Sequence, residues 1–105
     1  QQVQREIEIS VDAIWLATGH ELNVNHLEIL NSVRQSFPRD LIRGLPILTP
    51  DLEWAEGIEL YIAGALSALQ IGPDAFNLAG TAAAAARITE AILARREEAA
   101  RTSIT

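Results

Sequence analysis

Residues 59–92, ELYIAGALSALQIGPDAFNLAGTAAAAARITEAI, decide the fold expected for this chain. The segment Glu59–Ala63 is short, mostly apolar and β-prone, which predicts a buried strand that ends at a glycine. A glycine-rich crossing follows, and its Gly72-Pro73 pair suits the start of a helix because proline has no N–H to donate. The alanines and straight-chain residues beyond it have the lowest helix cost, so we predict a long helix near Asp74–Arg95.

The alanine-rich helix is expected to pack closely against a sheet. Apolar or small residues recur along it at three- and four-residue spacing, as in one face of an amphipathic helix. They are Leu78, Thr81, Ala85, Ile88 and Ile92. Glycines in the crossing before the helix allow the backbone to approach another chain segment or a ligand.

The first part of the chain predicts two strands and a helix. Residues near Ile7–Ser10 alternate with charged neighbours, which is typical of a half-exposed strand. Ala13–Ala17 is continuously apolar and predicts a strand that is covered on both faces, with Trp15 in a core or domain interface. We expect this strand to share a sheet with Glu59–Ala63. A helix is predicted near Asn25–Phe37, because Pro38 ends the periodic pattern.

Composition limits the classes of function. The 105 residues allow one domain or a piece of one, and 49% hydrophobic residues can build a core. The net charge of −6, with eight arginines and no lysine, argues against nucleic-acid binding. The absence of cysteine fits a reducing compartment, and a cytoplasmic location is expected. No apolar run reaches the ~18 residues of a membrane span, so we expect no membrane association.

Two blocks of sequence resemble one class of enzyme. Residues 12–19, DAIWLATG, are similar to the D-x-I-x-L-A-T-G signature of flavoproteins with two dinucleotide-binding domains. Residues 60–80, LYIAGALSALQIGPDAFNLAG, resemble the C-terminal FAD-contacting strand and helix of oxidoreductases related to the N-hydroxylating monooxygenases. The resemblance implies an α/β, partial Rossmann-like FAD-binding domain. It also implies that residues 1–105 are either a single domain or the C-terminal fragment of an FAD-dependent, NAD(P)H-linked oxidoreductase.

The same resemblance implies a set of cofactor-binding residues. The carboxyl ends of strands in such sheets face the cofactor crevice, and the helix after the glycine-rich turn would approach the isoalloxazine ring. The implied residues are Thr18, Gly19, Gly64, Ala65, Gly72, Pro73 and Asn77. For Asn77, two roles stay open: a polar contact in the pocket, or a helix-start residue that binds its own backbone. The G-x-G-x-x-G fingerprint that grips the FAD pyrophosphate is not in this sequence.

Other chemistry finds little support in the sequence. No Ser/His/Asp order is typical of a catalytic triad, and no catalytic residue is assigned. His20 and His26 are six residues apart and do not share a helical face, so no metal site is predicted. In flavoenzymes the cofactor carries the redox chemistry, so the lack of an acid–base motif does not exclude one.

Two hypotheses therefore remain open. The first is the flavoprotein part described above, whose partner would be the rest of its own parent chain. The second is a small non-catalytic α/β binding or assembly module. In either case unpaired strand edges and an uncovered apolar face predict that the isolated chain associates with itself.

Overall fold

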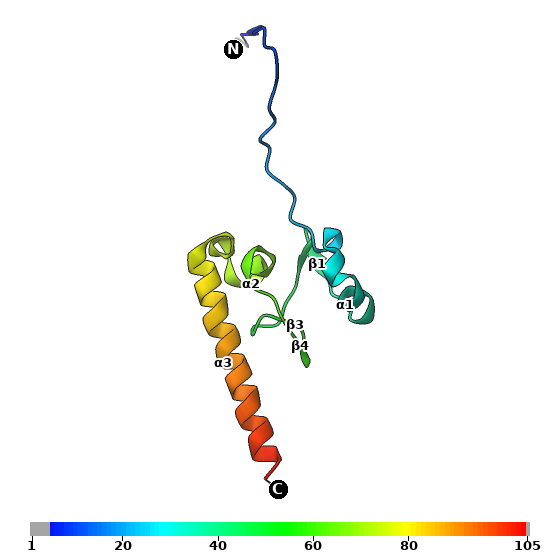
Figure 1. The fold of residues 1–105 in the computed structure, drawn as a ribbon, viewed down its shortest axis with the longest axis vertical. Helices are drawn as coiled ribbons and strands as arrows, with labels where there is room; N and C mark the ends of the chain where they lie inside the picture. The colour runs from blue at the N-terminus through cyan, green and yellow to red at the C-terminus, as the bar shows by residue number, and fades with distance from the viewer. Residues whose placement is uncertain (1–4, 105) are drawn as a thin grey trace.

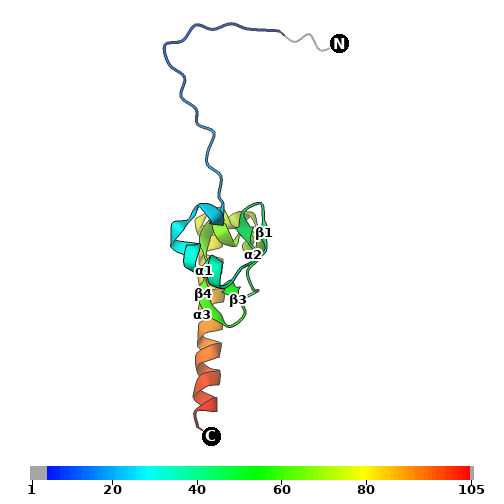
Figure 2. The same cartoon turned by 90° about the vertical axis from the view of Figure 1, so that its right-hand side faces the viewer.

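An extended arm and a long C-terminal helix leave a small folded body in opposite directions (Figures 1 and 2). The computed structural model describes residues 5–104. Its principal extents are 78 × 31 × 30 Å, and the radius of gyration is 20.9 Å. A compact domain of this length has a radius of gyration of about 13 Å, so the arm and the helix account for the elongation.

The N-terminal arm, residues 5–18, contains neither helix nor strand, and its backbone bends at Asp12. The strands predicted at Ile7–Ser10 and Ala13–Ala17 are therefore wrong as elements of this structure. Trp15, expected in a core, has 94% of its surface exposed. A strand exists only when its backbone groups pair with a neighbouring strand, and the arm has no neighbour within residues 5–104.

The predicted helix at Asn25–Phe37 is present as α-helix only in its second half. Two single turns of 3-10 helix, η1 (Val24–His26) and η2 (Glu28–Leu30), precede α1 (Asn31–Ser36). The helix is interrupted because Leu27 has extended backbone angles, with φ −99° and ψ 100°. The stop before Pro38 is confirmed, since the preceding Phe37 is already outside the helical region.

The strands form two separate antiparallel hairpins. In the first, β1 (Leu41–Ile42) pairs with β2 (Leu45–Pro46). Its two turn residues, Arg43 and Gly44, both have positive φ, at 50° and 79°, which is the geometry that tight hairpins favour.

The second hairpin contains the strand predicted from the sequence. Here β3 (Glu53–Ala55) pairs with β4 (Ile58–Tyr61), so the prediction at Glu59–Ala63 is confirmed over residues 59–61. The expected shared sheet with Ala13–Ala17 is wrong, because β4 pairs antiparallel with β3. The mixed α/β class holds, but a Rossmann-like parallel sheet is not seen in residues 5–104.

The chain after β4 is helical but divided. It forms η3 (Gly64–Ser67), α2 (Ala68–Ile71), η4 (Pro73–Phe76) and α3 (Leu78–Thr102). The helix predicted at Asp74–Arg95 is thus confirmed as a long C-terminal helix, but with other bounds. It cannot begin at Asp74, because Asn77 is extended at φ −133° and ψ 178°.

The core lies where α3 and α2 meet the hairpins and α1. Its buried apolar residues are Val24, Leu30, Leu48, Leu52, Trp54, Ile62 and Ala84. Trp54 is fully buried, and its indole N–H donates a 2.7 Å hydrogen bond to the backbone oxygen of Phe37. This bond satisfies the polar atom of the largest core side chain and ties the second hairpin to the end of α1.

The face of α3 that packs on the body differs from the predicted one. Gly80 and Ala84 are buried and Ile88 is half-buried, whereas Leu78 is 87% exposed. Thr81 and Ala85 are exposed as well, so the first half of the predicted stripe faces away from the core. α3 has this orientation because η4 packs directly against Gly80, which has no side chain that would keep the two elements apart.

Candidate functional site

A groove opens where the base of the arm meets the turn after β4 and the start of α3. It encloses about 740 Å³, within the range of ordinary ligand pockets. Three parts of the chain that are distant in sequence supply its walls. The lining residues are Gly19, His20, Leu22, Gly64, Ala65, Ala75, Phe76, Asn77, Leu78 and Thr81. We call this the arm-base groove.

Four of the seven sequence-predicted site residues line this groove. The groove brings together Gly19, Gly64, Ala65 and Asn77. Gly19 lies there although the strand expected before it, Ala13–Ala17, is absent. The other three, Thr18, Gly72 and Pro73, are not among the lining residues. Gly72 has φ 87° and ψ −162°, a conformation almost restricted to glycine, so it serves the break between α2 and η4.

Glycines at two points leave the groove wall without side chains. Gly19 has φ 77° and Gly64 has φ 75°, and L-residues rarely adopt either conformation. A Cβ atom added at either position would meet no atom within 4 Å. Both glycines therefore border open space, and a ligand in the groove can approach the backbone directly.

Asn77 anchors the loop at the end of the groove. Its side-chain oxygen accepts a 3.1 Å hydrogen bond from the N–H of Gly80, which makes it the N-cap of α3. Its side-chain nitrogen donates to the carboxylate of Asp74 over 3.0 Å. Of the two roles left open for Asn77, the structure therefore favours the helix-start residue, because both ends of the amide are engaged.

The groove is apolar and carries little charge. Phe76 and Leu78 are 66% and 87% exposed at its wall, and Leu22, Ala65 and Ala75 add further apolar surface. His20 is the one titratable side chain among the ten lining residues. This lining fits a flat apolar ring, which gains from contact with exposed aromatic and aliphatic surface. The lining contains no arginine, so the groove has no side chain that could pair with a pyrophosphate.

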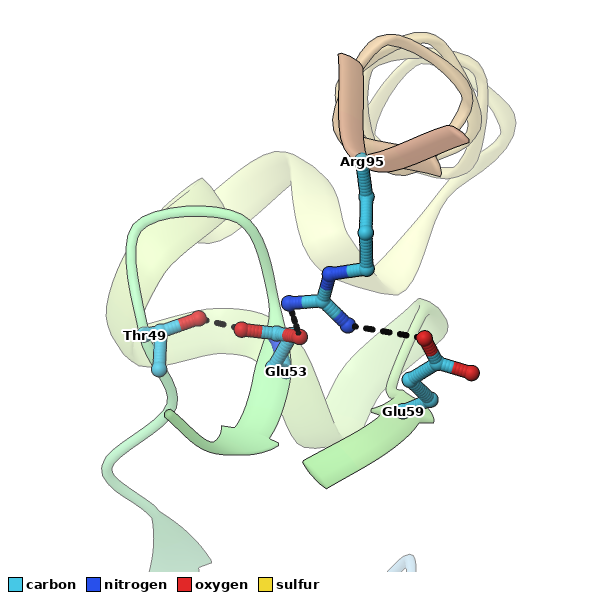
Figure 3. Close-up of polar contacts among 4 residues, drawn as sticks. All are labelled: Thr49, Glu53, Glu59 and Arg95. Carbon is cyan, nitrogen blue, oxygen red and sulfur yellow. Dashed lines mark hydrogen bonds and ion pairs between the residues drawn. The ribbon is translucent and has the colours of Figure 1, made fainter. Parts of the chain in front are cut away.

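A second cleft lies between β4 and the C-terminal half of α3. It encloses about 350 Å³ and is lined by Glu59, Tyr61, Ile92, Arg95, Arg96 and Ala99. Figure 3 shows that the Arg95 guanidinium points from α3 toward two carboxylates of the second hairpin. It is paired with the buried Glu53 and lies 3.5 Å from the exposed Glu59.

Arg95 fastens α3 to the second hairpin. Only 5% of the Glu53 side chain is exposed, so its carboxylate needs a partner in the fold. The backbone N–H of Glu53 also donates a 3.0 Å hydrogen bond to the Thr49 hydroxyl. The hydrogen bond to Glu53 is the main cause of the raised pKa of Arg95. Because this arginine is already occupied, we assign the second cleft a structural role and keep the arm-base groove as the candidate site.

Several residues that matter here were not found from the sequence. The arm-base groove is also lined by His20, Leu22, Phe76 and Leu78. The one signal that could have indicated them is that they lie close in sequence to Gly19 or Asn77. The Glu53–Arg95 pair joins positions 42 residues apart, and the sequence predicted no role for Glu53. Nothing in the local sequence distinguishes that glutamate from Glu56, which is exposed.

Comparisons with known proteins leave the family open. No protein-family model matches the chain, and no curated protein or solved structure matches it either. Within residues 5–104 no three His, Asp or Glu side chains gather where they could hold a metal ion. In the same range, no helix has the length and apolar character to cross a bilayer.

Proposed function

We propose that this chain forms part of the flavin site of an FAD-dependent, NAD(P)H-linked oxidoreductase, and that the arm-base groove receives the isoalloxazine ring. The observation that supports this is the meeting of Gly19, Gly64, Ala65 and Asn77 in one groove. The two sequence blocks that resemble flavoproteins both contribute to the lining of the same space.

The groove residues would bind and orient the ring. Gly19 and Gly64 leave the backbone free to approach it, and Phe76 and Leu78 offer apolar contact to its flat face. The N-terminus of α3, held by Asn77, directs a partial positive charge toward that end of the groove. The flavin itself supplies the redox chemistry. In this proposal the pyrophosphate and the nicotinamide nucleotide are bound by the rest of the parent chain.

The exposed arm favours a second candidate function, a non-catalytic assembly module. Ile7, Trp15 and Leu16 present 75%, 94% and 82% of their surfaces to solvent. Exposed apolar runs of this kind mark interaction surfaces. The two functions differ in what the groove does, because an assembly module needs no affinity for flavin.

Lumiflavin, an isoalloxazine ring without ribityl or phosphate groups, tests the proposal on this chain directly. We expect it to bind weakly to the 105-residue chain, with a change in flavin fluorescence. FAD should bind no more tightly than lumiflavin, because the groove has no group for its pyrophosphate.

Two glycines provide a matched pair of variants for that titration. Gly64 and Gly57 have φ of 75° and 78°, and both border open space, but only Gly64 lies in the groove. Asparagine is the side chain best tolerated at such angles. Gly64→Asn should weaken lumiflavin binding about tenfold or more, a loss of ~1.4 kcal/mol. Gly57→Asn, in the turn between β3 and β4, should leave it unchanged. Equal affinities in both variants would remove the groove from the proposal.

A further inference from the structure

The N-terminal arm carries the largest group of exposed apolar side chains in the described chain. Six of them, from Ile7 to Leu16, are 59–94% exposed. Figures 1 and 2 both show the arm standing clear of the body. Such a segment in water is an interaction site whose partner has to be identified.

Side chains alternate between the two faces of an extended chain, and the arm has one continuous apolar face. The odd-numbered positions from 7 to 17 are Ile7, Ile9, Val11, Ala13, Trp15 and Ala17. On the other face, Glu6, Glu8, Ser10 and Asp12 are polar, and Ile14 and Leu16 are apolar. This is the pattern of a strand in an antiparallel pair with one face to be covered.

The body of the chain cannot pair with the whole arm. Eleven extended residues, 7–17, span about 36 Å. The longest strand within residues 5–104, β4, has four residues, so a body strand could pair with about a third of the arm. Within this chain, the segment whose length matches the arm is another copy of the arm.

We propose that two copies of this chain pair through their arms, as an antiparallel two-stranded ribbon centred on Val11. In this register Ile7 lies opposite Trp15 of the second copy, Ile9 opposite Ala13, and Val11 opposite itself. The whole apolar face is then shared by both strands, and the aromatic–β-branched pair at each end adds stability. Pairing straightens the bend at Asp12. The inference rests on the arm and does not depend on flavin binding in the groove.

The charges of the arm, together with the length of the pairing, favour this register and direction. Centred on Val11, Glu6 lies opposite Leu16, Glu8 opposite Ile14, and Ser10 opposite Asp12, so no like charges face each other. A shift of the centre to Asp12 places two aspartates opposite one another, and a shift to Ser10 places Glu8 opposite Asp12. A parallel, in-register pair stacks every glutamate on itself. Like charges directly opposite are destabilising, which disfavours these alternatives. A register centred on Ala13 also avoids like charges, but it leaves Ile7 without a partner, so the Val11 register is preferred.

The ribbon predicts an even number of copies. A two-stranded ribbon is only marginally stable in water, and stability rises when its apolar face is covered. Two ribbons can cover each other by stacking these faces, at the ~10 Å spacing of packed sheets. The expected species are therefore a dimer and, at higher concentration, a tetramer of the 11.4 kDa chain.

Sedimentation equilibrium of the full chain tests the assembly. We expect a dimer–tetramer equilibrium at high micromolar concentration. Val11→Asp should convert it to monomer, because two carboxylates then face each other at the centre of the ribbon. Ile29→Asp, a matched control at a body residue that is 86% exposed, should leave the assembly unchanged. A monomeric parent chain, or a Val11→Asp variant that still assembles, overturns the proposal.

Disulfide trapping tests the register, because the chain has no cysteine of its own. Val11→Cys should form a covalent dimer rapidly on mild oxidation, since the two Cβ atoms lie opposite one another. Ile7→Cys should cross-link to Trp15→Cys in a mixture and far more slowly to itself. The arm does not touch the core, so these variants keep the far-UV circular dichroism of the folded body. If Val11→Cys forms the covalent dimer no faster than Ile29→Cys does, the proposed register is wrong. Assembly that appears only when a separate sheet-forming chain is added contradicts self-pairing.

Discussion

Replacement of Gly80 by alanine should destabilise the protein, against the usual preference of helices. In an exposed helix, glycine costs about 1 kcal/mol relative to alanine. Gly80 lies in the first turn of α3, where a Cβ atom would come within 1.9 Å of the backbone oxygen of Asp74 and 2.2 Å of its carbonyl carbon. Both are main-chain atoms of η4, so the clash is relieved only when η4 and α3 move apart.

The expected net effect is a loss of stability. Overpacking a closed site costs about 1–3 kcal/mol, and for rigid backbone neighbours we take the upper end of that range. After the ~1 kcal/mol gain in helix propensity, the net loss is about 1–2 kcal/mol. In a domain of this size each kcal/mol lowers the midpoint of thermal unfolding by about 4–8 °C.

Thermal unfolding followed by circular dichroism at the α-helical band measures this change. Ala82→Gly, at an exposed position two residues further along α3, is the matched control and should cost about 1 kcal/mol by propensity alone. If propensity governed both positions, Gly80→Ala would stabilise the protein by the same amount. A Gly80→Ala variant as stable as the parent, or more stable, would refute the close approach of η4 to α3.

Three further predictions follow from the polar contacts of α3 and the second hairpin. Arg95→Leu should lower the unfolding midpoint more than Arg96→Leu, because only Arg95 pairs with the buried Glu53; equal effects would argue against that pair. Asn77→Ala should cost about 1 kcal/mol through loss of the α3 cap, and Asn77→Ser should recover most of it, as measured by urea unfolding. Partial burial raises the pKa of Tyr61, the single tyrosine, above its ordinary value of 10.0. Its tyrosinate absorbance should therefore titrate at higher pH in the folded chain than in urea. The contribution of Tyr61 to the free energy of unfolding is fully present below pH 10.0 and is lost as pH rises through the pKa of the folded chain. A lower titration midpoint for the tyrosine in the folded chain than in urea would contradict this.

Local signals in the sequence predicted the elements that local interactions determine. The alanine-rich run is helical because its residues have low helix cost, and Pro38 ends α1 because the residue before a proline avoids the helical region. The strand at Glu59–Ala63 was predicted from its β-prone composition, and it forms because β3 pairs with it across a two-residue turn, although the predicted partner was Ala13–Ala17.

The predictions that failed concern pairing over long distances. Ala13–Ala17 has the composition of a covered strand, but composition does not specify a partner, and residues 5–104 offer none. The orientation of α3 depends on η4 and Gly80, which no periodicity of apolar residues can show. For the site, the glycine motifs indicated four groove residues, whereas Phe76 and Leu78 were missed because exposed apolar residues look like core residues in a sequence.

In the proposed function, the arm-base groove binds the isoalloxazine ring. Titration of the ¹⁵N-labelled chain with lumiflavin, followed through its backbone amide shifts, tests it most directly. We expect saturating shifts at Gly19, Gly64 and Ala65, together with small or no shifts at Arg95 and Ala99 in the second cleft. Shifts confined to the second cleft, or no saturating shift at the three groove residues, would contradict it.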